Sequence, residues 1–183
     1  IETELMLADL DSLEKRVDNL AKKAKGNDKD AKEALELVNR ALVLLREGKP
    51  ARFLERKPEE ERAFGMLGLL TSKPVLYVCN VEEGSAKEGN SFSKQVFEHA
   101  KKEGAVAVVI SAKIESEIAT LSREERAEFL ETLGLEEAGL DRLIRAGYQL
   151  LDLITYFTVG PKEARAWTIH RGTKAPAAAG VIH

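Results

Sequence analysis

The chain has 183 residues, enough for one ordinary domain or for two small parts of a larger protein. Hydrophobic residues make up 44% and charged residues 32%, which predicts a buried core beneath a densely charged surface and excludes a disordered tail. The formal net charge of -3 gives no global reason to bind nucleic acid or an anionic membrane.

Cysteine usage and the apolar runs bear on the cellular compartment. The single cysteine, Cys79, cannot pair within the chain, so nothing indicates an oxidising environment. No stretch is long and apolar enough to span a membrane, and the start has no signal architecture. We therefore expect a cytoplasmic protein with no membrane partner. The chain does not begin with Met, and "APAAAGVIH" at its end contains no closing strand or helix, so we expect both ends to be cut from a longer chain.

The first 71 residues have helical periodicity. Apolar residues recur in steps of three and four over residues 10–24 and again over 31–45, a pattern typical of two helices that pack along a seam. Gly26, in the turn between them, is expected to take the left-handed conformation that ends a helix. We predict an antiparallel coiled-coil hairpin, followed by a shorter connecting helix over residues 57–70.

Residues 72–150 alternate between strand and helix. The runs "PVLYVC" (74–79) and "AVAVVIS" (105–111) are typical of parallel strands covered on both faces, and residues 91–104 between them form an amphipathic crossover helix. Two further helices are predicted over 121–135 and 138–151. The side chains expected to face the core are Phe92, Val96, Phe97 and Ala100 of the crossover helix and Leu140, Leu143, Ile144, Tyr148 and Leu151 of the last helix.

Residues 151–183 return to strand character. Strands over 154–159 and 164–169, separated by a Gly-Pro turn, predict a β-hairpin that needs further strands to stand alone. An aromatic and basic surface for RNA is one interpretation of this segment. Its residues would be Arg165, Trp167, Arg171 and Lys174. The alternative is a half-buried Trp in an ordinary hairpin.

Polar residues follow both predicted parallel strands, where ligands bind in sheets of this kind. Asn80 and Glu83 lie after the first strand, with Val81 between them, and Ser111, Ala112 and Lys113 follow the second. An amide can bond both the donors and the acceptors of a purine edge, and a turn of small residues offers backbone N–H groups. Each motif is weak alone, but their placement at successive strand ends favours a nucleotide-base site.

The order strand, N-x-x-[DE], helix, strand, S-A-K resembles the base-recognition half of P-loop GTPase domains. More specifically, "TSKPVLYVCNVEE", "EERAEFLETLGLEEAGLDRLIRAGYQLLDLITYFT" and "KEARAWTIHRGTKAPAAAGVIH", after a hairpin beginning "TELMLADLDSLEK", resemble the YchF family of Obg-like ATPases. The resemblance covers essentially the whole chain, in the family's order.

The resemblance implies an α/β architecture in three parts. These are a helical coiled-coil hairpin with its connecting helix (1–71), the C-terminal half of a P-loop GTPase-like parallel-sheet domain (72–150), and the start of a β-grasp-like TGS domain (151–183). The P-loop, the magnesium ligands and the remaining TGS strands are implied to lie outside this chain, which contains no G-x-x-x-x-G-K-[ST] motif. We therefore expect no catalytic residue and no metal site in this segment.

The resemblance also assigns roles at the strand ends. Asn80 reads the base, Val81 packs on it, and Ser111, Ala112 and Lys113 form the second wall. Glu83 replaces the shorter aspartate that selects guanine in N-K-x-D. The parent is thus implied to hydrolyse ATP in preference to GTP, with Mg²⁺, and to associate with the ribosome or another translation component, whereas this chain alone should be inactive.

Two other functions stay open. One is a non-catalytic module in which the helical arm and the TGS fragment bind RNA or protein while the half-sheet is only a scaffold. The other is a GTP-specific GTPase. A P-loop directly upstream in the parent would favour an enzyme over the interaction module.

Overall fold

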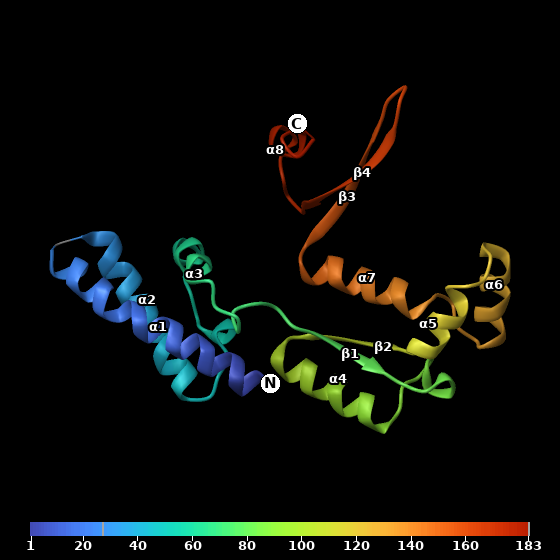
Figure 1. The fold of residues 1–183 in the computed structure, drawn as a ribbon, viewed down its shortest axis with the longest axis horizontal. Coiled ribbons are helices and arrows are strands. Elements are labelled where there is room, and N and C mark those ends of the chain that lie inside the picture. Colours follow the sequence, from blue (N-terminus) through green and yellow to red (C-terminus); the bar gives the residue numbers. More distant parts are fainter. Residues whose placement is uncertain (27, 183) are drawn as a thin grey trace. The chain divides into compact units, whose positions relative to one another are not determined.

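The structure is a computed structural model that describes residues 1–26 and 28–182. The chain divides into two compact units, Ile1–Pro74 and Val75–His183, whose elements are drawn in Figure 1. Asn27 in the expected turn and His183 at the end of the expected TGS segment lie outside the described residues. The boundaries expected after residues 71 and 150 stay predictions.

The first unit is helical. Its elements are α1 (Glu2–Lys25), α2 (Lys29–Arg46), the 3-10 turns η1 (Ala51–Phe53) and η2 (Pro58–Glu60), and α3 (Glu61–Leu67). Helices α1 and α2 lie side by side (Figure 1) and bury the predicted seams in one core, with Leu13 and Val38 fully enclosed. Phe64 and Leu67 of α3 belong to the same core, so the predicted connecting helix packs on the helix pair.

The expected left-handed Gly26 is wrong. Its φ is -76° and its ψ is 13°, and its N–H donates to the Lys23 carbonyl at 3.0 Å. The Asp28 side chain accepts from the Ala31 N–H at 3.1 Å and caps α2. The first helix therefore ends at Gly26 without a left-handed glycine, and the second begins from an acidic cap.

A buried carboxylate closes the base of the helical unit. Asp9 on α1 is only 2% exposed, and it accepts from the Leu70 N–H at 2.7 Å, the Thr71 N–H at 2.8 Å and the Thr71 hydroxyl at 2.6 Å. The Thr71 hydroxyl oxygen in turn accepts from the Ala51 N–H at 3.0 Å. One acidic side chain thus joins the start of the unit to its end.

The second unit holds the predicted strands. Its elements are β1 (Leu76–Asn80), η3 (Glu83–Ser85), α4 (Ser91–Glu103), β2 (Val106–Ile110), α5 (Ala112–Ile118), α6 (Arg123–Thr132), α7 (Gly139–Leu150), β3 (Leu153–Val159), β4 (Ala164–His170) and α8 (Ala175–Ala179). Strands β1 and β2 pair in parallel and α4 connects them, which confirms the predicted βαβ unit. Strands β3 and β4 form the predicted antiparallel hairpin.

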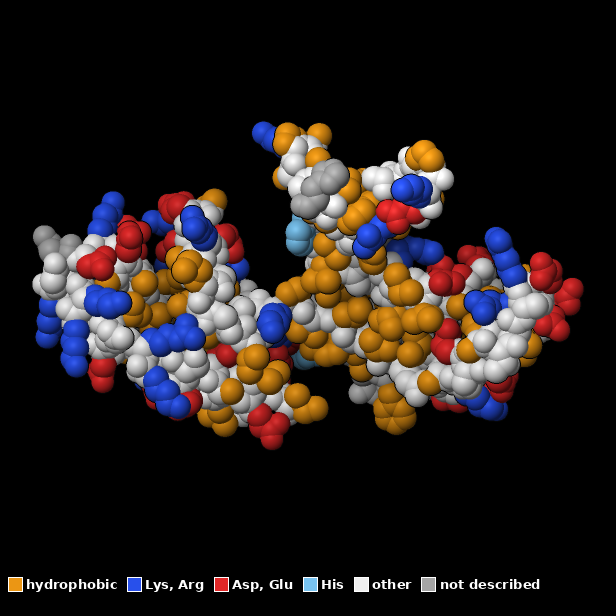
Figure 2. All heavy atoms as spheres, turned by 45° about the horizontal axis from the view of Figure 1, so that its top comes forward, with side chains coloured by type: hydrophobic (Ala, Val, Ile, Leu, Met, Phe, Trp, Pro, Cys, Tyr) orange, Lys and Arg blue, Asp and Glu red, His pale blue; other side chains and the backbone are white. Residues whose placement is uncertain are grey.

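The expected inward faces of two helices are partly wrong. Five of the expected inward side chains are exposed, namely Phe92, Phe97, Leu140, Ile144 and Leu151. The expected Ala100 is buried, as is Ala146, which was not named. Two strands give each helix only a narrow surface to cover, so the apolar faces extend past the sheet. Figure 2 shows hydrophobic side chains gathered on one face of this unit.

Two short helices were not predicted. Helix α5 begins directly after Ser111, and α8 forms within the segment that was expected to contain no closing helix. The α8 expectation failed because Pro176 in the first turn and the alanines that follow favour a helix. The Tyr156 hydroxyl donates to the Ala178 carbonyl at 2.8 Å and fixes α8 to β3. No helix among the described residues is long and apolar enough to cross a bilayer.

The Asp9 network gives a prediction for stability. Replacing Asp9 with Ala leaves two backbone N–H groups and a hydroxyl without their acceptor, so we expect the helical unit to lose about 3 kcal/mol of unfolding free energy. Hydrogen exchange of the α1 and α2 amides measures this loss separately from the second unit. The matched control is Asp11→Ala, which removes an exposed pair with Lys15 and should change less than about 0.5 kcal/mol. Equal effects of both substitutions would contradict the role of Asp9.

Candidate functional site

The carboxyl ends of β1 and β2 meet at one edge of the parallel sheet. Asn80 lies opposite Ile110, and the Val81 N–H extends the pairing by donating to the Ile110 carbonyl at 2.9 Å. Beyond that pair, the Asn80 Oδ1 accepts from the Ala112 N–H at 2.9 Å. The structure therefore brings together two predicted site residues that are far apart in the sequence.

This contact fixes the orientation of the Asn80 amide. One lone pair of Oδ1 is used by the Ala112 N–H, which leaves a second lone pair and both Nδ2 hydrogens. Asn80 itself is exposed, and no protein group in residues 1–26 and 28–182 accepts from its Nδ2. A planar ligand with one acceptor and one donor on the same edge can therefore bond to it.

Ser111 lies beneath this edge. It precedes the first turn of α5, its carbonyl accepts from the Glu115 N–H at 3.0 Å, and it is buried. Its hydroxyl oxygen has no hydrogen-bond partner among the described residues. An unpaired buried hydroxyl costs roughly 1–3 kcal/mol, so this polar atom is a candidate for a partner that the chain itself does not provide.

An ion pair joins the two polar motifs. The Lys113 Nζ lies 2.6 Å from the Glu83 Oε2, and it connects η3 to the first turn of α5. The hydrogen bond to the Glu83 carboxylate and its charge raise the pKa of the Lys113 ammonium. Both side chains are partly exposed, so the pair adds little stability, but it holds the Glu83 carboxylate toward Lys113.

The residues between Asn80 and Glu83 point in different directions. Val81 is only 8% exposed, so its side chain packs into the protein and leaves little surface for the expected contact with a base. Glu82 is exposed and accepts from the Ser85 hydroxyl at 2.5 Å and from the Asn90 Nδ2 at 3.5 Å. The bond from Ser85 lowers the pKa of the Glu82 carboxyl. Glu82 therefore fastens its own loop.

A contact that sequence reasoning missed positions α5. The Glu115 Oε1 accepts from the Gly139 N–H at 2.7 Å, which joins α5 to the start of α7. A Cβ at residue 139 would lie 2.8 Å from that oxygen and 3.1 Å from the Ile110 Cγ2, so any larger residue would force the Glu115 side chain and Ile110 to shift. No local pattern indicates this contact, because it depends on the packing of two helices.

The residues considered for RNA divide into two groups. The Arg165 guanidinium lies 4.2 Å from the centre of the Trp167 ring, and the Trp167 Nε1 donates to the Thr158 Oγ1 at 2.8 Å. Arg171 instead forms an ion pair with Asp152 at 3.0 Å, and exposed Lys174 directly precedes α8 without a side-chain capping bond. Arg165 lies near the hairpin turn and Arg171 follows the other end of β4, so the structure does not unite the four residues. The RNA surface stays a prediction.

No group of three His, Cys, Asp or Glu side chains in the described part of the chain is arranged to hold a metal ion. The chemistry that this edge offers is hydrogen bonding by amide, hydroxyl and backbone groups beside an ion pair. Such a surface can bind a nucleotide base, and the expectation of no catalytic residue in this segment stays a prediction.

Comparison with known proteins shows which proteins the chain is similar to. The family model YchF-GTPase_C, described as a protein of unknown function (DUF933), matches residues 153–183. The ribosome-binding ATPase YchF of Escherichia coli O157:H7 is 51% identical over 183 residues, which are all of this chain and 50% of that protein. All 183 residues are homologous to YchF proteins.

Two further proteins that match the chain are also YchF proteins. The ribosome-binding ATPase YchF of Bacillus subtilis is 48% identical over 185 aligned residues, again covering all of this chain and 50% of that protein. The solved structure of the Schizosaccharomyces pombe YchF GTPase matches the whole chain with a TM-score of 0.87 and 31% identity, and half of that protein is covered. The chain thus spans about half the length of the YchF proteins it matches.

Cys79 gives a prediction about the strand that carries Asn80. Burial raises the pKa of the Cys79 thiol, so less thiolate is present at a given pH in the folded chain than in the unfolded chain. We expect Cys79 to react more slowly with an aromatic disulfide reagent in the folded protein than in the unfolded protein. The reaction rate of the folded protein should also increase at a higher pH than that of the unfolded protein. The same chain in urea is the control, since Cys79 is its only thiol. If the reaction rate of the folded protein increased at the same pH as that of the unfolded protein, or at a lower pH, the expectation would be contradicted.

Proposed function

We propose that this chain supplies the base-recognition half of a YchF-type ATPase that prefers ATP to GTP. The observation that carries the proposal is the hydrogen bond from the Ala112 N–H to the Asn80 Oδ1 at 2.9 Å, at the joined ends of β1 and β2. In this proposal the parallel sheet belongs to a P-loop GTPase-like domain, the helical unit is its coiled-coil hairpin, and β3 and β4 begin a TGS domain.

The orientation of Asn80 favours adenine. Its Nδ2 donates to N7 of either purine, and the free lone pair of Oδ1 accepts from the N6 amino group of adenine. Guanine has an acceptor, O6, at the place of that amino group, which would face the Oδ1 lone pair. The amide therefore forms two bonds with adenine and one with guanine.

The ion pair removes the usual means of selecting guanine. A carboxylate that accepts from N1–H and the N2 amino group of guanine would have to face the base edge. Here the Glu83 carboxylate is bound by Lys113 at 2.6 Å, and its charge is compensated. In our proposal Lys113 thereby acts together with Glu83 to leave the site open to adenine, and the buried Ser111 hydroxyl gains a partner when the pocket is complete.

The phosphates and Mg²⁺ would be bound by parts of the parent outside this chain. Phosphoryl transfer depends on positioned phosphates, metal and water, and the described residues supply none of the P-loop groups. We therefore propose that the parent hydrolyses ATP, that this chain alone does not, and that base contacts alone bind weakly. The printed name of the relatives, ribosome-binding ATPase, supports binding of the parent to the ribosome. We propose that this binding depends on the nucleotide, with Arg165 and Trp167 as candidate RNA contacts.

Asn80→Ala tests the proposal in the full-length parent. Losing two hydrogen bonds to adenine should weaken ATP binding about tenfold or more, and GTP binding less. Isothermal titration with each nucleotide measures both affinities. The control is Asn39→Ala, an exposed asparagine on α2 that should leave both unchanged. If the Asn80 variant bound ATP as well as the unchanged protein, Asn80 would not recognise the base. That result would favour the non-catalytic interaction module.

Glu83→Asp tests the role of the ion pair. The side chain is one methylene shorter, so it should lose its contact with Lys113 and become available to guanine. We expect the ratio of the GTP Kd to the ATP Kd to fall by about tenfold, the size of one base-edge contact. Lys113→Met is the companion variant, because it frees the carboxylate without shortening it. If neither variant moves the ratio, other residues set the preference.

A further inference from the structure

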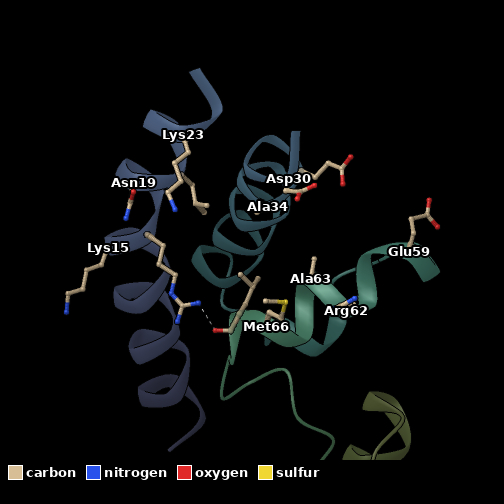
Figure 3. Close-up of a pocket in the computed structure, with 13 residues that line it drawn as sticks. Lys15, Asn19, Lys23, Asp30, Ala34, Glu59, Arg62, Ala63 and Met66 are labelled. Atoms are coloured by element: carbon tan, nitrogen blue, oxygen red, sulfur yellow. Dashed lines mark hydrogen bonds between the residues drawn. The ribbon is translucent and has the colours of Figure 1, made fainter. Parts of the chain in front are cut away.

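The helical unit contains a groove that the nucleotide site does not use. Its volume is about 650 Å³, and it lies between α1, α2 and the segment formed by η2 and α3 (Figure 3). Apolar side chains from all three helices line it. They are Leu20, Ala34, Ala63, Met66 and Leu67. Met66 is 77% exposed, so part of this apolar surface faces water.

The two sides of the groove carry opposite charges. On the α1 side, Lys15 and Lys23 lie on the rim, and Figure 3 shows Lys15, Asn19 and Lys23 in a row along this helix. On the opposite side are Asp30 and Glu33 of α2 and Glu59 of η2. One cation, Arg62, also lies on this acidic side.

The charges remain available to a ligand. Lys15 pairs with Asp11 and Glu33 pairs with Lys29, but all four side chains are more than half exposed, and such pairs contribute little. Lys23 and Asp30 form no ion pair among residues 1–26 and 28–182. Arg16 is used differently, since it donates to the Leu67 carbonyl at 2.9 Å and joins α1 to the end of α3.

Shape and charge together select the class of ligand. A cavity of about 150 Å³ already admits a benzene-sized group, so 650 Å³ has room for about four apolar side chains. An amphipathic helix provides such a row at i, i+3, i+4 and i+7, and exposed methionine is common in grooves that bind these helices. RNA and anionic membranes are disfavoured, because the acidic side would repel phosphates.

We propose that this groove binds one amphipathic α-helix of a partner protein. Its apolar stripe lies on Leu20, Ala34 and Met66, its acidic flank faces Lys15 and Lys23, and its basic flank faces the acidic side. The site lies wholly within the helical unit and is independent of the proposed nucleotide function.

Designed peptides test the proposal on the 183-residue chain. Three 18-residue helical peptides share one Leu and Met stripe and differ in their flanks, which are Glu and Lys, Lys only, or Glu only. Fluorescence anisotropy of labelled peptide measures each Kd. We expect the mixed peptide to bind at least about fivefold more tightly than either single-charge peptide, because only it matches both sides of the groove.

Variants of the chain locate the contact. Met66→Lys should weaken the mixed peptide roughly tenfold, whereas Leu7→Lys, at a 58% exposed apolar position on α1 outside the groove, should not. Lys23→Glu should weaken the mixed peptide and strengthen the Lys-only peptide. That change of sign separates a charge contact from loss of folding, and circular dichroism checks that each variant is folded.

Four outcomes would overturn the proposal. Equal binding of the three peptides would mean that charge does not select the ligand, and equal effects of Met66→Lys and Leu7→Lys would place the contact elsewhere. A dimer of the free chain that Met66→Lys dissociates would make a second copy the occupant. Binding by this chain that is lost in the full-length parent would show that the parent covers the groove itself.

Discussion

The site depends on the shared ending of two parallel strands. Because β1 and β2 pair without a bulge up to Asn80 and Ile110, the next residues along both strands lie side by side, and the Asn80 amide reaches the Ala112 N–H. A slip of one residue would turn Asn80 to the other face of the sheet and remove this bond. The hydrogen bond from the Gly139 N–H to Glu115 then holds α5 in the position in which the Ala112 N–H reaches Asn80.

Local patterns in the sequence were sufficient for most elements of the fold. The seams of α1 and α2, the crossover helix and the β-hairpin all have a period that reports a contact with a neighbouring element. The helix faces were harder. A pattern indicates which side of a helix is apolar, but not how much sheet exists to cover it, and two strands leave Phe92 and Leu140 exposed.

Some features of the candidate site could be predicted from the sequence and others could not. The position of Asn80 and Ser111 at strand ends could be read from the sequence, because a strand and its end are local features. The pairing of Lys113 with Glu83 could not, since these residues are far apart in sequence and meet only because α5 begins directly after β2. The burial of Val81 also depends on the turn into η3, where the chain directs this side chain inward.

Two buried polar residues of this chain differ in whether the protein satisfies their hydrogen bonds. Asp9 is enclosed and its hydrogen bonds are satisfied by the protein, so it stabilises the helical unit and has nothing left to offer a ligand. Ser111 is equally enclosed, but its hydroxyl lacks a partner among the described residues. Such a group raises the free energy of the folded chain until something else bonds to it. The unmet hydrogen bond of Ser111 therefore marks the strand ends as a place where binding of a partner returns free energy to the protein.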